Sequence, residues 1–176
     1  MITPLDQQLL QKLSLEAIES PRRRKNRNFH ENSEAQAHRL LNAIEPNSYV
    51  RPHKHNDPNK GETIICLSGK LGLIVFDSTG NVEQQLTLEA GGKTVGVDIP
   101  YGIFHTVLAL KNGTVFFEAK AGPFVPIKAE EQAPWAPAEG DDLVTSYLRR
   151  IQLRSAILVI MRHPSLVQEK RPHEVF

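Results

Sequence analysis

The sequence predicts a mainly β protein, a jelly-roll barrel with an N-terminal helix and a C-terminal helical extension. Short apolar runs separated by turn residues fill positions 38–117, which is the pattern of an antiparallel sandwich or barrel. These runs follow one another with no helical pattern between them, and this favours a jelly roll over a parallel α/β sheet. Helical periodicity is instead found toward the two ends of the chain, and the part after Gly122 is rich in proline.

The N-terminal segment predicts an amphipathic helix from about Pro4 to Glu19. Thr3 is a suitable N-cap and proline is favoured at the first helical position. Ser20 precedes Pro21, and a residue before proline is pushed out of the helical region, so the helix should end there. Apolar residues recur at helical spacing at Leu5, Leu9, Leu13 and Ala17.

Turn residues divide the central part of the chain into candidate strands. The expected strands are 38–44, 49–55, 62–67, 71–76, 84–88, 94–99, 105–110 and 114–120. We therefore divide the chain into an N-terminal helix with a basic lead-in (1–37), a barrel (38–122), and a proline-rich segment, helix and tail that pack on the barrel (123–176).

Composition excludes several classes of partner. The chain has 176 residues with Lys and Arg totalling 21 and Asp and Glu totalling 20, so a net charge of +1 gives no long-range field for nucleic acid or anionic lipid. The start of the sequence lacks the pattern of a secretory signal, and no apolar run approaches the length of a membrane span. A single cysteine, Cys66, excludes an intrachain disulfide and suits a reducing compartment. We expect a cytoplasmic protein.

Two histidines in one candidate strand point to a metal site. Side chains alternate along a strand, so Tyr49, Arg51, His53 and His55 are expected on one face. Two imidazoles that are two residues apart on the same face can converge on one ion. An isolated pair of this kind is often only two satisfied or exposed histidines, so further ligands are needed to support the prediction.

Glu62 and His105 are the expected third and fourth ligands. Glu62 opens the next strand after a polar turn, where its carboxylate can reach the same inner face; Asp57 in that turn is an alternative. Pro100 and Gly102 shape a tight turn that delivers His105 at the start of a later strand. The predicted ligands are therefore His53, His55, Glu62 and His105.

These residues resemble the two motifs of the cupin superfamily, G-x5-H-x-H-x3,4-E-x6-G and G-x5-P-x-G-x2-H-x3-N. The matching residues, in order, are His53, His55, Glu62 and Gly69, then Pro100, Gly102 and His105. The resemblance implies a double-stranded β-helix with the metal inside the barrel. There are departures: residues 56–61 lengthen the gap before Glu62, and Ala109 stands in place of the final asparagine.

A closer resemblance, over residues from about 5 to 151, is to the WbuC family of cupin-fold metalloproteins. In that family the longer gap before the glutamate is normal, which supports Glu62 as a ligand. Gly61 departs from the usual tryptophan, and the tail beyond about residue 152 has no counterpart. The matching segments are 21–22, 26, 28–30, 40–43, 51–60 and 133–139. The resemblance implies a link to surface polysaccharide biosynthesis.

Three imidazoles and one carboxylate suit zinc, iron, manganese, nickel or cobalt, and ligand type does not choose among them. An octahedral ion would keep positions for water, oxygen or substrate, whereas a four-coordinate zinc would be closed and structural. Arg51 can clamp a carboxylate or phosphate, or can be a rim arginine paired with an acid. Tyr49 should share its face, Glu118 should join them if its strand faces inward, and His30 is a candidate acid, base or substrate contact.

We therefore expect a metal-dependent enzyme that acts on a small polar or anionic metabolite, with sugar-derived compounds favoured. An isomerase or epimerase and an iron-dependent dioxygenase are comparable alternatives within this class. A metal-dependent binding or sensing module without turnover is a further alternative, followed by a purely structural metal site. Because barrel edges are commonly covered by pairing of subunits, we also expect a homodimer.

Overall fold

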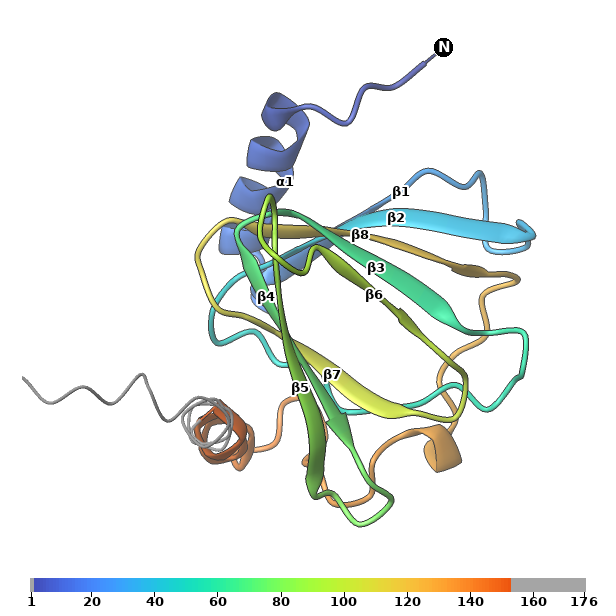
Figure 1. Cartoon of the computed structure of the whole chain (residues 1–176), viewed down its shortest axis with the longest axis vertical. Coiled ribbons are helices and arrows are strands. Elements are labelled where there is room, and N and C mark those ends of the chain that lie inside the picture. Colours follow the sequence, from blue (N-terminus) through green and yellow to red (C-terminus); the bar gives the residue numbers. More distant parts are fainter. Residues whose placement is uncertain (1, 153–176) are drawn as a thin grey trace, which may run out of the picture.

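The computed structural model describes residues 2–152, in which two antiparallel β-sheets enclose a core (Figure 1). One sheet has the strand order β1-β2-β8-β3-β6 and the other the order β5-β4-β7. The elements in chain order are α1 (Gln7–Glu19), β1 (Arg24–Asn28), β2 (Ala37–Ile44), β3 (Glu62–Ser68), β4 (Lys70–Phe76), β5 (Val82–Glu89), β6 (Gly96–Ile99), β7 (Phe104–Ala109), β8 (Thr114–Ala121) and η1 (Ala129–Glu131). Residues 144–152 are helical again. The predicted mainly β barrel with helical ends is confirmed.

Gly69 marks the point where the chain passes from one sheet to the other. It separates β3 from β4 and has a φ of +71°, a conformation that favours glycine. A Cβ at this position would lie 2.7 Å from Thr114 Cα at the start of β8. The close approach holds the two sheets together at this end, where Thr114 Oγ1 also donates to the carbonyl oxygen of Lys70 at 3.1 Å.

Two predictions of strands were wrong. Residues 49–55 form no regular strand; His53 alone makes bridges, to His105 and to Gln132. Pro52 interrupts this segment and has no N–H to offer a ladder. Conversely, the basic segment that we expected as a lead-in forms β1 and pairs with β2. Its side chains are nearly all polar and exposed, so it lacks the apolar alternation that would have indicated a strand.

Helix α1 starts at Gln7, three residues later than predicted, and its N-cap is Asp6 instead of Thr3. The Asp6 carboxylate accepts a hydrogen bond from the Leu9 N–H at 2.9 Å, which satisfies one of the free donors of the first turn. The helix lies outside the sheets over β1 and β2 (Figure 1). A cluster joins the helix to the barrel and contains Leu10, Leu13, Ala17, Leu41, Ala43 and Val115.

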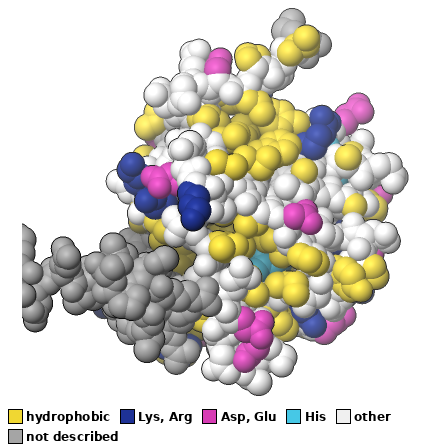
Figure 2. Space-filling view, in the orientation of Figure 1, with side chains coloured by type: hydrophobic (Ala, Val, Ile, Leu, Met, Phe, Trp, Pro, Cys, Tyr) yellow, Lys and Arg dark blue, Asp and Glu magenta, His cyan; other side chains and the backbone are white. Residues whose placement is uncertain are grey.

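The segment after the barrel packs on the outer face of the smaller sheet. Residues of this segment form one apolar cluster with β4 and β7, which includes Ile74, Phe76, Leu108, Ala133, Ala136, Tyr147 and Leu148. The predicted tail, 153–176, lies outside the described residues. Within residues 2–152 no helix has the length and apolar character needed to cross a membrane. Acidic and basic side chains are interspersed on the face in Figure 2, in keeping with a net charge of +1.

We predict that burial decides the effect of leucine substitutions on α1. Leu13 is 3% exposed against the barrel and Leu15 is 62% exposed. Leu13→Ala should lower the free energy of unfolding by about 2–5 kcal/mol, because it leaves a cavity under the helix. Leu15→Ala, the matched control, should change it by less than about 0.5 kcal/mol. Urea titration of the two variants checks this, and equal losses would contradict the docking of α1.

Candidate functional site

The structure brings the four predicted metal ligands to one place inside the barrel. His53 and His105 are neighbours: the His53 N–H donates to the His105 carbonyl oxygen at 3.0 Å, and the His105 N–H returns a bond to His53 at 2.9 Å. Glu62 is the first residue of β3. Its Oε1 lies 3.0 Å from His105 Nε2 and 3.2 Å from His55 Nε2. Residues from three separate parts of the chain therefore meet at this carboxylate.

The backbone orients two of the imidazoles. The Nδ1 of His53 lies 3.0 Å from the Arg51 carbonyl oxygen, and the Nδ1 of His105 lies 2.9 Å from that of Ile103. A proton on each Nδ1 satisfies these carbonyls and leaves Nε2 free as a lone-pair donor, which is the form that ligates metals. His53, His55 and Glu62 each offer an atom within 4.8 Å of the others.

Two atoms of this cluster are buried without a hydrogen-bond partner. His55 Nε2 and Glu62 Oε1 are only 3.2 Å apart, yet they are not aligned as a hydrogen bond. Leaving such groups unsatisfied costs about 1–3 kcal/mol each. Imidazole nitrogen and carboxylate oxygen atoms are ordinary ligands of a divalent cation, and a cation bound by both atoms would satisfy them. The residues present therefore fit a metal ion.

Electrostatics favour the charged carboxylate. Burial acts to raise the pKa of Glu62, but the imidazoles of His105 and His55 and the Lys120 ammonium outweigh it and hold the pKa below the usual range. Burial lowers the pKa of His53 to about 4, assisted by the charge of His105. Burial also acts to lower the pKa of His105, but Glu62 raises it above its ordinary value. Without metal, the buried negative charge is thus balanced by His105.

Strand β8 contributes polar residues to the site. Glu118 was a candidate from the sequence, whereas Lys120 and, on the neighbouring strand β2, Asn42 were not. Glu118 faces inward and lines the cavity with Phe116, so the condition on which its place in the interior depended is met. Lys120 Nζ lies 2.5 Å from Glu118 Oε1 and 3.7 Å from Glu62 Oε2, while Asn42 Nδ2 donates to Glu118 Oε2 at 2.7 Å. Alternation along β8 could have placed Lys120 on the same inward face as Glu118. The position of Asn42 beside Glu118 could not be predicted without knowing that β2 pairs with β8.

The cluster opens onto a cavity of about 610 Å³. Arg51 lies in its wall, where its guanidinium donates to Gln132 Oε1 and, at 3.0 Å, to the Ala133 carbonyl oxygen. The Nε of Arg51 is buried without a hydrogen-bond partner, and Arg51 forms no ion pair within residues 2–152. Arg51 is therefore a lining residue whose positive charge has no carboxylate partner among the described residues.

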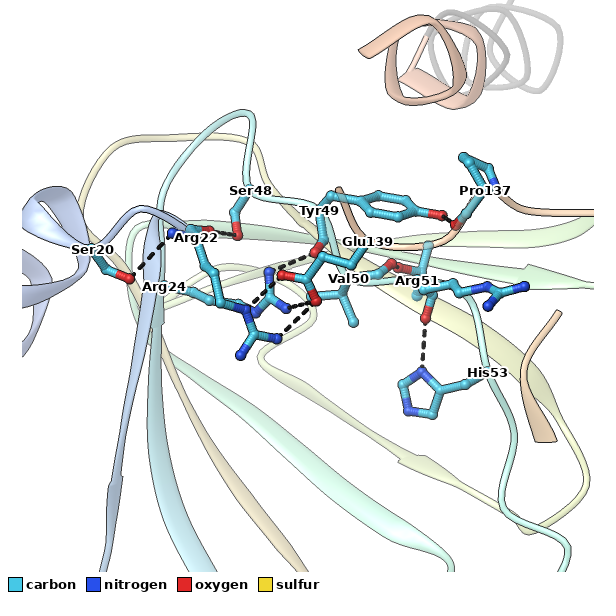
Figure 3. Close-up of polar contacts among 11 residues, drawn as sticks. Ser20, Arg22, Arg24, Ser48, Tyr49, Val50, Arg51, His53, Pro137 and Glu139 are labelled. Atoms are coloured by element: carbon cyan, nitrogen blue, oxygen red, sulfur yellow. Dashed lines mark hydrogen bonds and ion pairs between the residues drawn. The ribbon is translucent and has the colours of Figure 1, made fainter. Parts of the chain in front are cut away.

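Tyr49 and His30 do not line this cavity. Tyr49 points away from His53, and its hydroxyl donates to the Pro137 carbonyl oxygen at 2.8 Å (Figure 3). The expected shared face fails because residues 49–55 are not a regular strand. His30 stacks on His38 with ring centroids 3.9 Å apart. Asp57, the alternative to Glu62, is exposed and accepts from the Asn59 N–H at 2.9 Å within its own turn.

Comparison with known proteins gives partial matches. Residues 5–88, just under half of the chain, match a family described as a domain of unknown function (DUF6016). No curated protein matches the sequence. Similar solved structures include an oxalate decarboxylase from Lactobacillus farciminis, with 20% identity over 51% of this chain and a TM-score of 0.41. The match spans 25% of that longer chain.

Two shorter proteins are matched over more of their length. KdgF from Halomonas sp. has 11% identity, with 58% of this chain and 81% of that chain covered and a TM-score of 0.45. A cupin-2 domain containing protein from Shewanella frigidimarina has 20% identity, with 56% of this chain and 80% of that chain covered and a TM-score of 0.43.

We predict that the metal-free protein loses stability as the pH falls from 6.5 to 4.5. The pKa of His53 is about 4 in the folded protein, against 6.5 for a histidine in an unstructured peptide, so the unfolded chain binds more protons in this window. The loss should be about 2 kcal/mol. The other two shifted groups do not reverse this loss. The raised pKa of His105 gives a contribution to the free energy of unfolding that is fully present below pH 6.5. The lowered pKa of Glu62 gives a contribution that is fully present above about pH 4.5.

Urea titrations at both pH values, on chelator-treated protein, measure this effect. His53→Gln is the control, because it removes the titrating group and keeps a polar side chain of similar reach. The variant should lose less stability than the natural chain between the two pH values. An equal loss in both proteins would contradict a buried, neutral His53.

Proposed function

We propose that this chain is a metal-binding cupin that holds one divalent transition metal with His53, His55, Glu62 and His105. The single observation that carries the proposal is the pair of buried atoms, His55 Nε2 and Glu62 Oε1, which lie 3.2 Å apart without an aligned hydrogen bond. A cation would satisfy both lone pairs and would take over the role that His105 has in balancing Glu62. Zinc, iron, manganese, nickel and cobalt all suit this ligand set.

We further propose that the cavity binds a small polar or anionic metabolite and that the protein is an enzyme. A bound metal supplies Lewis acidity or a centre for oxygen chemistry. The chain's own residues would bind and orient the ligand: Arg51 offers an uncompensated positive charge, and Asn42 and Glu118 offer an amide and a carboxylate in the same wall. The cavity of about 610 Å³ is of the size that small-molecule sites have.

The resemblance to the WbuC family supports a sugar-derived metabolite and a role in surface polysaccharide biosynthesis. An isomerase or epimerase reaction and an iron-dependent oxygenase reaction are the two chemistries that we propose to test. A homodimer in the cytoplasm is part of the same proposal. The dimer is supported by the edge strand β6, whose backbone can pair with a second chain. The location is supported by Cys66, which is free and buried.

We predict that each ligand variant loses metal. His53→Ala, His55→Ala and Glu62→Gln each remove a coordinating atom, so metal affinity should fall by more than about 100-fold, the upper end of what outer-shell partners cost. Elemental analysis of freshly purified protein, followed by metal titration of chelator-treated protein, measures this. His30→Asn is the control, because His30 does not line the cavity, and it should retain the metal of the natural chain. Equal metal content in all variants would contradict the site.

The mass of the product, compared with that of the substrate, distinguishes the two reaction classes. Metal-loaded protein is incubated in air with sugar acids and sugar phosphates, and products are analysed by mass spectrometry and chromatography. An isomerase gives a product of unchanged mass that separates from the substrate, whereas an oxygenase adds oxygen. Retention of an unaltered compound on the protein, with no product, would support a binding module instead of an enzyme.

A further inference from the structure

Two arginines at the cavity wall hold a carboxylate of the chain itself. Glu139 Oε1 accepts from Arg22 Nε at 2.6 Å, and Glu139 Oε2 accepts from Arg22 Nη2 at 2.9 Å and from Arg24 Nη2 at 2.8 Å (Figure 3). The planar fork of a guanidinium matches the two oxygens of a carboxylate or a phosphate. All three residues line the same cavity as His53 and Glu62.

Positive charge exceeds negative charge around this contact. Arg22 and Arg24 both lie in the cavity wall, and Glu139 is the one carboxylate that both guanidiniums contact among the described residues. The side chain of Arg24 is only 19% exposed, and it also donates to the Tyr49 carbonyl oxygen at 2.6 Å. Burial partly desolvates this charge and lowers the pKa of Arg24. An anion beside a partly desolvated guanidinium offsets part of the cost of burying its charge.

Glu139 is placed so that it can give way to another anion. Its side chain is 41% exposed and that of Arg22 is 61% exposed, and exposed ion pairs of this kind contribute little stability. The preceding segment is fixed at Pro137 by the Tyr49 hydroxyl, two residues before Glu139. The following residue, Gly140, has a φ of +88° and open space around it. The carboxylate can therefore swing out while the segment stays attached to the barrel.

We propose that Arg22 and Arg24 form an anion subsite of the cavity, which Glu139 occupies when no ligand is bound. The group that it receives is an oxyacid, a carboxylate or a phosphate, on a ligand whose other polar groups face the His and Glu cluster. The inference rests on the proposed function in one respect, that the cavity takes a ligand. It does not depend on the metal, because neither arginine contacts a proposed metal ligand.

The test uses the full chain, chelator-treated, titrated separately with inorganic phosphate and with acetate. Binding is followed in nitrogen-15 spectra through the Nε–H resonance of Arg22, which should move when Glu139 is displaced. Glu139→Gln removes the competing charge and should strengthen binding of the anion about fivefold. Since this is a gain of affinity, it cannot arise from misfolding.

Arg24→Gln should weaken binding of the same anion at least about fivefold, because a desolvated donor is lost. Arg27→Gln is the matched control, because Arg27 lies on the same strand, is exposed, and does not line this cavity. A response to phosphate alone assigns a phosphate group, and a response to acetate alone assigns a carboxylate.

Three outcomes would overturn the inference: no response of Arg22 to either anion, unchanged or weaker binding in Glu139→Gln, or an equal loss in Arg27→Gln and Arg24→Gln. Failure of the proposed metal site would be seen separately, as absence of metal in the natural chain with the anion response intact.

Discussion

The carboxylate of Glu62 is the group on which the site depends, because it is a buried charge held between two imidazoles. It is 4% exposed, and His55, His105 and Lys120 all approach it. Burying a carboxylate is costly unless cations and donors surround it. In this chain the surrounding groups are titratable, so protons and the proposed metal ion would compete for the same position. That competition would link the stability of the barrel to the binding of the metal.

The fold supplies the geometry for this arrangement. The reciprocal backbone bonds between His53 and His105 fix two imidazoles, although the segment around His53 is not a strand. Pairing of β3 with β8 then places Glu62 opposite Lys120, with Glu118 two residues away on the same inward face. The register of β3 and β8 thus places the carboxylates and Lys120, whereas the imidazoles come from the segment around His53 and from β7 of the other sheet.

Part of this could be predicted from sequence, for clear physical reasons. Turn residues bounded most of the strands. The spacing of His53 and His55 indicated a shared site because that pair is local, and the turn before His105, with its motif, indicated the further histidine. Strand β1 was missed because exposed polar residues carry no periodic signal. Tyr49 was expected in the cavity, but the alternation that predicted it requires a regular strand. The contact of Arg22 with Glu139 joins residues far apart in the chain, and no local pattern records it.

The most direct measurement is anomalous X-ray diffraction, at the absorption edge of the bound ion, from crystals of the metal-loaded full chain. We predict one strong peak in contact with Nε2 of His55 and His105 and Oε1 of Glu62, with His53 completing the ligands. A peak elsewhere in the molecule, with Glu62 still held against His105, would contradict a metal site at this carboxylate.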